Sequence, residues 1–181
     1  MGKVHPSITP PVAAFIGAQH VFFVATAPLD GDGHVNLSPK GLDTLRVLDE
    51  STVAYLDLTG SGVETVAHVR ENGRITLMWC AFEGAPRIVR VHGRGEVVAL
   101  DDPRVAGLFE ELPGARAVVI VRAERVSDSC GYAVPLYRYE GQRSRLLEWA
   151  EHRGPDGIEA YRAEKNATSI DGLPGVETAR T

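Results

Sequence analysis

The chain has few of the features that mark membrane, secreted or metal-binding proteins. No stretch reaches the roughly 18 consecutive apolar residues that a membrane-spanning helix needs, and the start, MGKVHPSITPP, lacks the basic-then-apolar layout of a secretory signal. Its two cysteines, Cys80 and Cys130, have no CxxC spacing and no nearby histidine, so both are interpreted as reduced thiols. We therefore expect a cytoplasmic protein that does not contact the membrane.

Motifs for metal binding and nucleophilic catalysis are also missing. The six histidines are scattered and include no HExxH pair, so no metal site is expected. Ser127 and Ser129 lack the G-x-S-x-G elbow of a nucleophilic serine. The net charge is −5 and the basic residues form no cluster, which argues against a nucleic-acid partner.

The hydrophobic pattern predicts a mainly β protein with one sizeable core. Six segments have the alternating, β-branched character of strands, and few helices separate them, which favours an antiparallel barrel or sandwich over a parallel sheet. The predicted strands are 20–27, 34–39, 52–58, 74–82, 87–100 and 115–126. Gly93 and Gly95 are expected to bend the fifth strand through a bulge.

Helices are predicted around these strands and after them. Helical spacing and capping signals appear at 10–19, 63–72 and 101–112. From about Gly141 the composition becomes helical and charged, with two amphipathic helices at 143–153 and 156–167. We expect a barrel domain over 1–140 and a helical C-terminal extension over 141–181.

The polar turn DLTGSGVET, residues 57–65, has two interpretations. Ser61 and Glu64 have the spacing of a capping box, in which each side chain accepts a hydrogen bond from the other residue's amide. The same glycine-flanked helix start could instead present unpaired amides to a phosphate, with Gly60 and Gly62 allowing close backbone approach. Spacing alone leaves both open.

The order of segments narrows the choice. HVNLSPKG, then VAYLDLTGSGVET with its helix, then ENGRITLMWCAF and the hairpin into RIVRVHGRGEVV resemble the flavin-binding split-barrel family typified by pyridoxamine 5′-phosphate oxidase. The resemblance covers about residues 21–126. It implies a homodimer of six-stranded antiparallel split β-barrels with peripheral helices, each binding FMN non-covalently at the subunit interface beside a small-molecule substrate.

The resemblance also assigns residues of one strand to the cofactor. By position, Asn36, Leu37 and Ser38 would lie along the isoalloxazine edge and supply backbone and side-chain hydrogen bonds. Lys40, at the end of that strand, occupies the place of a phosphate-binding lysine. This part of the expected site therefore combines hydrogen bonds to the flavin ring with a cation for its phosphate.

The remaining assigned residues follow later in the chain. Ser61, Gly62 and Thr65 fall at the turn where the family grips the 5′-phosphate. Arg87, which opens the hairpin strand, is a further candidate for the flavin tail or ring.

Two departures from the family pattern bear on function. Members with pyridoxamine oxidase activity usually carry an Arg-Lys pair where this chain has Glu64 and Thr65, and a carboxylate beside a phosphate dianion is unfavourable. The family's C-terminal Arg-x-His motif, which contacts the vitamin, has no counterpart in SIDGLPGVETART. We therefore do not expect true pyridoxamine 5′-phosphate oxidase activity.

The sequence predicts an FMN-binding, flavin-dependent oxidoreductase of unknown substrate, with no identifiable catalytic side chain. Three alternatives stay open. The chain could use a reduced deazaflavin coenzyme, it could store or sense flavin without turnover, or it could be a structural dimer whose cofactor site has decayed.

Overall fold

A computed structural model describes residues 2–176 of the chain. These residues form eight strands and three helices. In chain order they are β1 (Lys3–His5), α1 (Pro10–Gly17), β2 (Phe22–Thr26), β3 (Asn36–Lys40), β4 (Leu45–Asp49), β5 (Thr52–Leu58), α2 (Glu64–Asn72), β6 (Arg74–Cys80), β7 (Ile88–Val98), β8 (Ala115–Ser129) and α3 (Arg145–Lys165).

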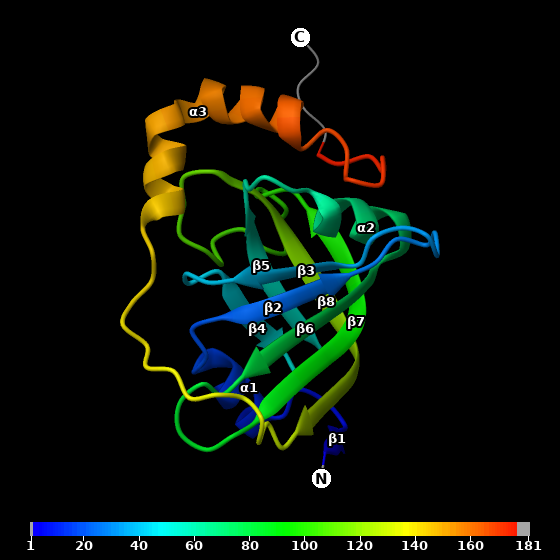
Figure 1. The fold of residues 1–181 in the computed structure, drawn as a ribbon, viewed down its shortest axis with the longest axis vertical. Coiled ribbons are helices and arrows are strands. Elements are labelled where there is room, and N and C mark those ends of the chain that lie inside the picture. The colour runs from blue at the N-terminus through cyan, green and yellow to red at the C-terminus, as the bar shows by residue number, and fades with distance from the viewer. Residues whose placement is uncertain (1, 177–181) are drawn as a thin grey trace.

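The strands form one antiparallel sheet that twists into a split barrel (Figure 1). Its order is β3-β2-β6-β7-β8-β5-β4, and β1 pairs with β8 outside this path. The strand β7 pairs with β8 over its whole length, and these two long strands form the centre of the sheet. This arrangement confirms the predicted antiparallel fold.

Alternating side chains of the strands fill the barrel. In β2, Phe22, Val24 and Thr26 are buried while the residues between them are partly exposed, as expected for a strand with one face on a core. Trp79 and Tyr55 are the largest fully buried side chains. Phe22 packs against both of them, with ring centroids 6.2 Å from Trp79 and 5.5 Å from Tyr55.

The predicted bulge is present where β7 bends. The pairing of β7 with β8 shifts register between His92 and Gly93. A Cβ atom on Gly93 would lie 2.0 Å from the carbonyl oxygen of Arg122, so only glycine fits this close approach.

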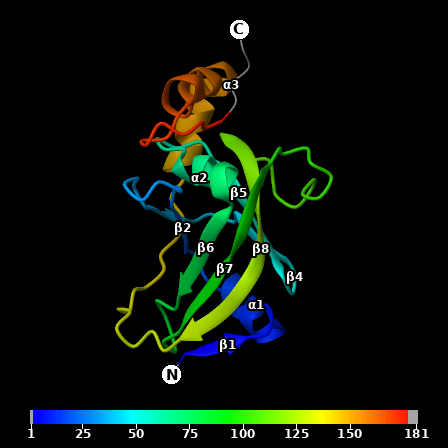
Figure 2. The same cartoon turned by 90° about the vertical axis from the view of Figure 1, so that its right-hand side faces the viewer.

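The two predicted C-terminal helices are also confirmed, as two segments of α3. Gly154 interrupts the helix with φ of 66° and ψ of 174°, and Pro155 follows it. An extended arm, residues 130–144, carries the chain from β8 along the outside of the barrel to α3, which stands over α2 (Figures 1 and 2). The boundary between a barrel domain and an extension stays a prediction, and residues 177–181 lie outside the described part.

Two expectations about the elements are wrong. The sheet has eight strands rather than six, because β1 and β4 are short strands with little alternation. Residues 101–112 form a series of turns rather than a helix. The Asp102 carboxylate accepts the Arg104 amide at 2.9 Å, and Gly107 takes a φ of 75°, which stops helical winding.

Candidate functional site

The turn between β5 and α2 differs from a capping box. The helix begins at Glu64 with Val63 as its N-cap, and neither side chain of the expected box closes it. The Glu64 carboxylate instead turns over Gly62, where a Cβ atom would lie 2.2 Å from Glu64 Oε2. Glu64 Oε1 accepts the amide of Ile170 at 3.4 Å. The capping-box interpretation is therefore wrong, and Gly62 is needed to make room for this carboxylate.

The backbone amides of the turn are left without acceptors. The Thr59 amide donates to the carbonyl of Gly114 at 2.8 Å, and the next amide that donates is that of Ala67, to the Val63 carbonyl at 3.0 Å. Between them, the amides of residues 60–66 donate to no acceptor within residues 2–176. Free amides at a helix start, at the positive end of the helix dipole, favour an anion.

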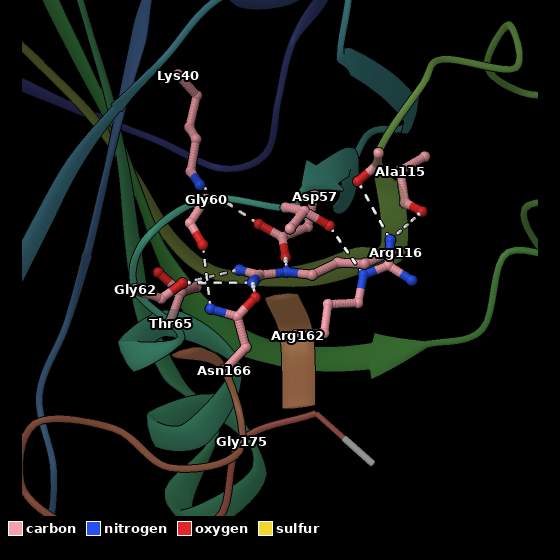
Figure 3. A network of polar contacts seen from close by, with 12 residues as sticks. Lys40, Asp57, Gly60, Gly62, Thr65, Ala115, Arg116, Arg162, Asn166 and Gly175 are labelled. Atoms are coloured by element: carbon pink, nitrogen blue, oxygen red, sulfur yellow. Dashed lines mark hydrogen bonds and ion pairs between the residues drawn. The ribbon is translucent and has the colours of Figure 1, made fainter. Parts of the chain in front are cut away.

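A buried carboxylate lies beside the turn (Figure 3). Asp57, at the end of β5, is fully buried and accepts Arg116 Nε at 2.5 Å and Lys40 Nζ at 3.3 Å. Burial alone would raise the pKa of Asp57, but Arg116 and Lys40 outweigh it and hold the pKa below its ordinary value. Asp57 is therefore ionised, and it fixes both cations next to the turn.

Two arginines connect this carboxylate and the turn to the neighbouring segments. Arg116 donates to the Gly62 carbonyl and to Asn166 Oδ1, at 3.3 and 2.8 Å. Arg162 donates from Nε to Thr59 Oγ1 at 2.9 Å and also reaches the carbonyl of Ala115. Lys40 and Arg116 thus pair with the same buried aspartate, so Asp57 balances only one of their two positive charges, whereas Arg162 also faces Glu159 at 3.9 Å.

The polar side chains of β3 bond to one another and to α2. Asn36 Nδ2 donates to Thr26 Oγ1 at 3.1 Å and to Thr65 Oγ1 at 2.9 Å, while its Oδ1 accepts Ser38 Oγ at 3.0 Å. The Leu37 side chain points outward and is 63% exposed. Both N–H groups of Asn36 Nδ2 are therefore used within the chain.

A buried histidine extends this network. His68, on α2, is fully buried, and its Nδ1 lies 3.0 Å from Thr26 Oγ1. Its Nε2 has no hydrogen-bond partner among the described residues. Burial lowers the pKa of His68 despite the opposing effect of Asp171, so the ring is neutral. One signal for this residue was readable in the sequence: it lies one helical turn after Thr65 on the same face of α2.

We expect His68 to make the protein less stable as the pH falls. Its folded-state pKa lies below that of the unfolded chain, so the unfolded state binds more protons at acidic pH, and the stabilisation is lost below about pH 6.5. One such proton changes the free energy of unfolding by at most about 1.4 kcal/mol per pH unit. Urea denaturation between about pH 7.5 and pH 5.5 measures this slope.

The matched comparison is His68→Gln against His152→Gln, since His152 is exposed on α3. The first variant should flatten the pH dependence, and the second should leave it unchanged. The slope that remains in His68→Gln is expected to come from His92, whose pKa burial also lowers. An unchanged slope in His68→Gln would contradict the assignment.

A large cavity adjoins the turn. Its volume is about 1150 Å³, and it lies between the barrel and the arm. Its lining includes Lys40, Thr59 and Gly60 from the barrel side and Tyr137, Tyr139 and Trp149 from the arm and α3. The cavity, the lysine and the free amides therefore meet at Gly60.

The structure brings together most but not all of the predicted site residues. Lys40 lies beside the turn, through Asp57, and Thr65 links α2 to Asn36. Ser61 is exposed on the turn. Arg87 is placed elsewhere: its guanidinium pairs with Asp128 at 3.1 Å and lies 4.8 Å from the centre of the Phe15 ring.

Besides His68, the residues of the site that were missed in the sequence are Asp57, Arg116, Arg162 and Asn166. Asp57 and Arg116 carried a usable signal, because each is a charge within an apolar strand, and buried charges are paired. Asn166 carried none, because it follows an amphipathic helix at a position where asparagine is common.

The described residues offer no other obvious chemistry. Among residues 2–176 no three His, Cys, Asp or Glu side chains gather into a metal-binding group. Over the same range, no helix has the length and apolar character needed to cross a membrane.

A split barrel with a glycine-rich turn beside a large cavity defines the class of this protein, and comparison with known sequences identifies the family. The family model described as pyridoxamine 5′-phosphate oxidase matches residues 8–130, and the chain belongs to this family. Pyridoxamine 5′-phosphate oxidase family protein ustO of Aspergillus flavus is 42% identical over 181 residues, covering 89% of this chain and 72% of that protein.

Solved structures share the fold. A variant of HupZ from Group A Streptococcus is 25% identical with a TM-score of 0.53, covering 67% of this chain and 99% of that one. A FAD binding protein from Mycobacterium smegmatis has a TM-score of 0.50 at 15% identity, covering 70% of this chain and 97% of its own. The second likeness concerns the fold alone.

Proposed function

We propose that the chain binds FMN at the turn between β5 and α2 and acts as a flavin-dependent oxidoreductase on a small-molecule substrate. The observation that carries the proposal is the run of unoccupied amides at residues 60–66, beside Lys40 and open to a cavity at Gly60. Membership of the family, and a FAD binding protein with the same fold, support a flavin as the ligand.

The residues present fit such a cofactor. The 5′-phosphate would meet backbone N–H groups and the Lys40 ammonium, which donates one of its three N–H groups to Asp57. The cavity volume of about 1150 Å³ slightly exceeds the usual range for small-molecule sites, so it has room for the ring and a substrate. Tyr137, Tyr139 and Trp149 would give the ring an apolar, aromatic surrounding.

In this proposal the flavin supplies the hydride chemistry, and the protein supplies binding, orientation and polarity. Lys40 and the turn would hold the anionic tail. Of β3, Pro39 and Lys40 line the cavity. By the family resemblance the backbone of β3 and the Ser38 hydroxyl would border the ring, where Ser38 could only accept because its own O–H donates to Asn36. We assign no acid or base to a side chain, and we do not propose pyridoxamine 5′-phosphate as the substrate.

A subunit interface at the site is part of the proposal. Leu37, on the outward face of β3, and Tyr132, on the arm, are 63% and 82% exposed. Exposed apolar side chains of this kind mark association surfaces. Light scattering should give twice the monomer mass of 19.5 kDa, and a strictly monomeric protein that binds FMN tightly would rule out a site completed by a second copy.

Titration with FMN tests the proposed function. We expect quenching of flavin fluorescence with a saturable, one-to-one stoichiometry, and a yellow protein after purification. A parallel titration with a deazaflavin coenzyme separates the two cofactors. Tighter deazaflavin binding would replace FMN in the proposal, and no binding of either would remove it.

Two observations favour the other candidates. Glu64 stands over the turn, which disfavours a dianionic tail and leaves room for a deazaflavin with a different tail. The side-chain hydrogen bonds of Asn36, Ser38 and Thr65 join only non-titratable groups, so they offer no acid or base to the ring, which suits a flavin store or sensor. Rapid, substrate-dependent reoxidation of the bound flavin in stopped-flow experiments would exclude the role of a flavin store or sensor.

A further inference from the structure

The C-terminal segment, residues 162–175, forms hydrogen bonds with the turn on the side opposite the free amides. Asn166 Nδ2 donates to the Gly60 carbonyl at 3.0 Å (Figure 3). Arg162 holds Thr59 Oγ1 at 2.9 Å, and the Ile170 amide holds the Glu64 carboxylate at 3.4 Å. The C-terminal segment therefore reaches Thr59, Gly60 and Glu64 of the turn.

Asn166 makes the central hydrogen bonds between the C-terminal segment and the turn. It is fully buried, and its Oδ1 accepts Arg116 Nη1 at 2.8 Å while its Nδ2 donates to Gly60. Its backbone amide donates to the Arg162 carbonyl at 2.8 Å. Because one side-chain atom only accepts and the other only donates, no other residue type reproduces both bonds at this length.

Packing holds the segment against the start of α2. A Cβ atom on Gly175 would lie 2.1 Å from the Asn166 carbonyl oxygen and 2.9 Å from Val63 Cγ1. Arg70, on α2, donates to the Gly175 carbonyl. The segment thus lies in direct contact with the helix whose first amides are free.

The contacts with the C-terminal segment determine which way the free amides of the turn point. In a planar trans peptide the carbonyl and the N–H point in opposite directions. Asn166 holds the Gly60 carbonyl on one side, so the Ser61 N–H points to the other, and Arg116 does the same for Gly62 and the Val63 N–H. Hydrogen bonds to a carbonyl also polarise the peptide and strengthen its N–H as a donor.

We propose that Asn166 is a positioning residue for the anionic cofactor tail, acting through the Gly60 carbonyl and, with Arg116, through the Gly62 carbonyl. The inference rests on the proposed function. It assigns to the C-terminal segment the task that an Arg-Lys pair would perform with side chains: this chain has Glu64 and Thr65 there and relies on oriented backbone amides instead.

The experiment compares FMN with riboflavin, which lacks the phosphate, on the full-length chain. For Asn166→Ala we expect FMN affinity to fall about tenfold, the equivalent of one hydrogen bond to a charged group, with riboflavin affinity unchanged. A purely structural role for Asn166 would weaken both ligands alike, and that result would overturn the inference.

The matched control is Asn72→Ala at the other end of α2. Asn72 also uses both side-chain atoms on backbone groups, donating to the Ala27 carbonyl and accepting the Arg74 amide, each at 2.9 Å. This variant should lose a similar amount of stability and keep the FMN-to-riboflavin ratio of the wild type. An equal loss of the ratio in both variants would contradict a specific role for Asn166.

A second variant tests the inference if Asn166→Ala folds poorly. Asn166→Asp keeps the shape and the bond from Arg116 but has no donor for Gly60, so it should also lower the FMN-to-riboflavin ratio. If the wild type itself binds FMN no better than riboflavin, the proposed phosphate anchor is wrong. If the wild type prefers FMN and both Asn166 variants keep that preference, only this inference is wrong.

Discussion

Arg116→Met should lower the free energy of unfolding by about 3–5 kcal/mol, because it leaves the buried carboxylate of Asp57 without its main partner. Arg116 is 4% exposed and also serves the Gly62 carbonyl and Asn166, so its loss opens the contact between β8, the turn and the C-terminal segment. Lys40, at 3.3 Å and partly solvated, replaces little of this. Chemical denaturation at neutral pH gives the change.

Arg122→Met is the matched control. Arg122 lies on the same strand, β8, but its side chain is exposed and has no ion pair or hydrogen bond among the described residues. The change there should stay within about 0.5 kcal/mol. A loss below about 1 kcal/mol for Arg116→Met would show that water or a rearranged side chain satisfies Asp57, and that this network does not hold the turn in place.

Lys40→Met should weaken FMN binding by about 10- to 100-fold, the range for a hydrogen bond between charged groups. Methionine keeps most of the stem that lines the cavity and removes only the ammonium. Because Arg116 still pairs with Asp57, the barrel should stay folded. Isothermal titration of the folded variant measures the effect.

Salt dependence separates this electrostatic role from a packing role. Wild-type affinity should fall as ionic strength rises, and Lys40→Met should show a smaller dependence, because screening acts on the lost charge pair. Lys40→Arg should restore part of the affinity. Unchanged FMN affinity in Lys40→Met would mean that this lysine only pairs with Asp57 and does not anchor the cofactor.

Much of the fold could be predicted because its signals are local. The hairpin of β2 and β3, the bulge at Gly93 and the break at Gly154 each follow from residues that are neighbours in the chain. Residues 101–112 misled the prediction because an aspartate, a proline and spaced apolar residues mark turns as well as helices. Nothing local in β4 distinguishes it from a loop, since its strand character depends on pairing with β5.

The site was less predictable because its contacts are long-range. Family resemblance pointed to Lys40 and the turn, but the bonds that hold the turn join Asp57 to Arg116 and Gly60 to Asn166, which lie far apart in sequence. Ser61 and Glu64 matched a capping pattern, yet the helix begins only at Glu64, whose carboxylate accepts the distant Ile170 amide. The position of Arg87 just before a strand gave no information about its Asp128 partner, and its role at the flavin stays a prediction.

The most direct test of the central claim is to observe the amides of the turn themselves. In a two-dimensional ¹⁵N–¹H spectrum, FMN should shift the resonances of Gly60, Ser61 and Gly62 strongly, and riboflavin should shift them little. That outcome would place the phosphate on the backbone donors that the chain leaves unoccupied. If FMN shifts other regions and leaves these three amides unmoved, the turn is not the anchor and the proposed site is wrong.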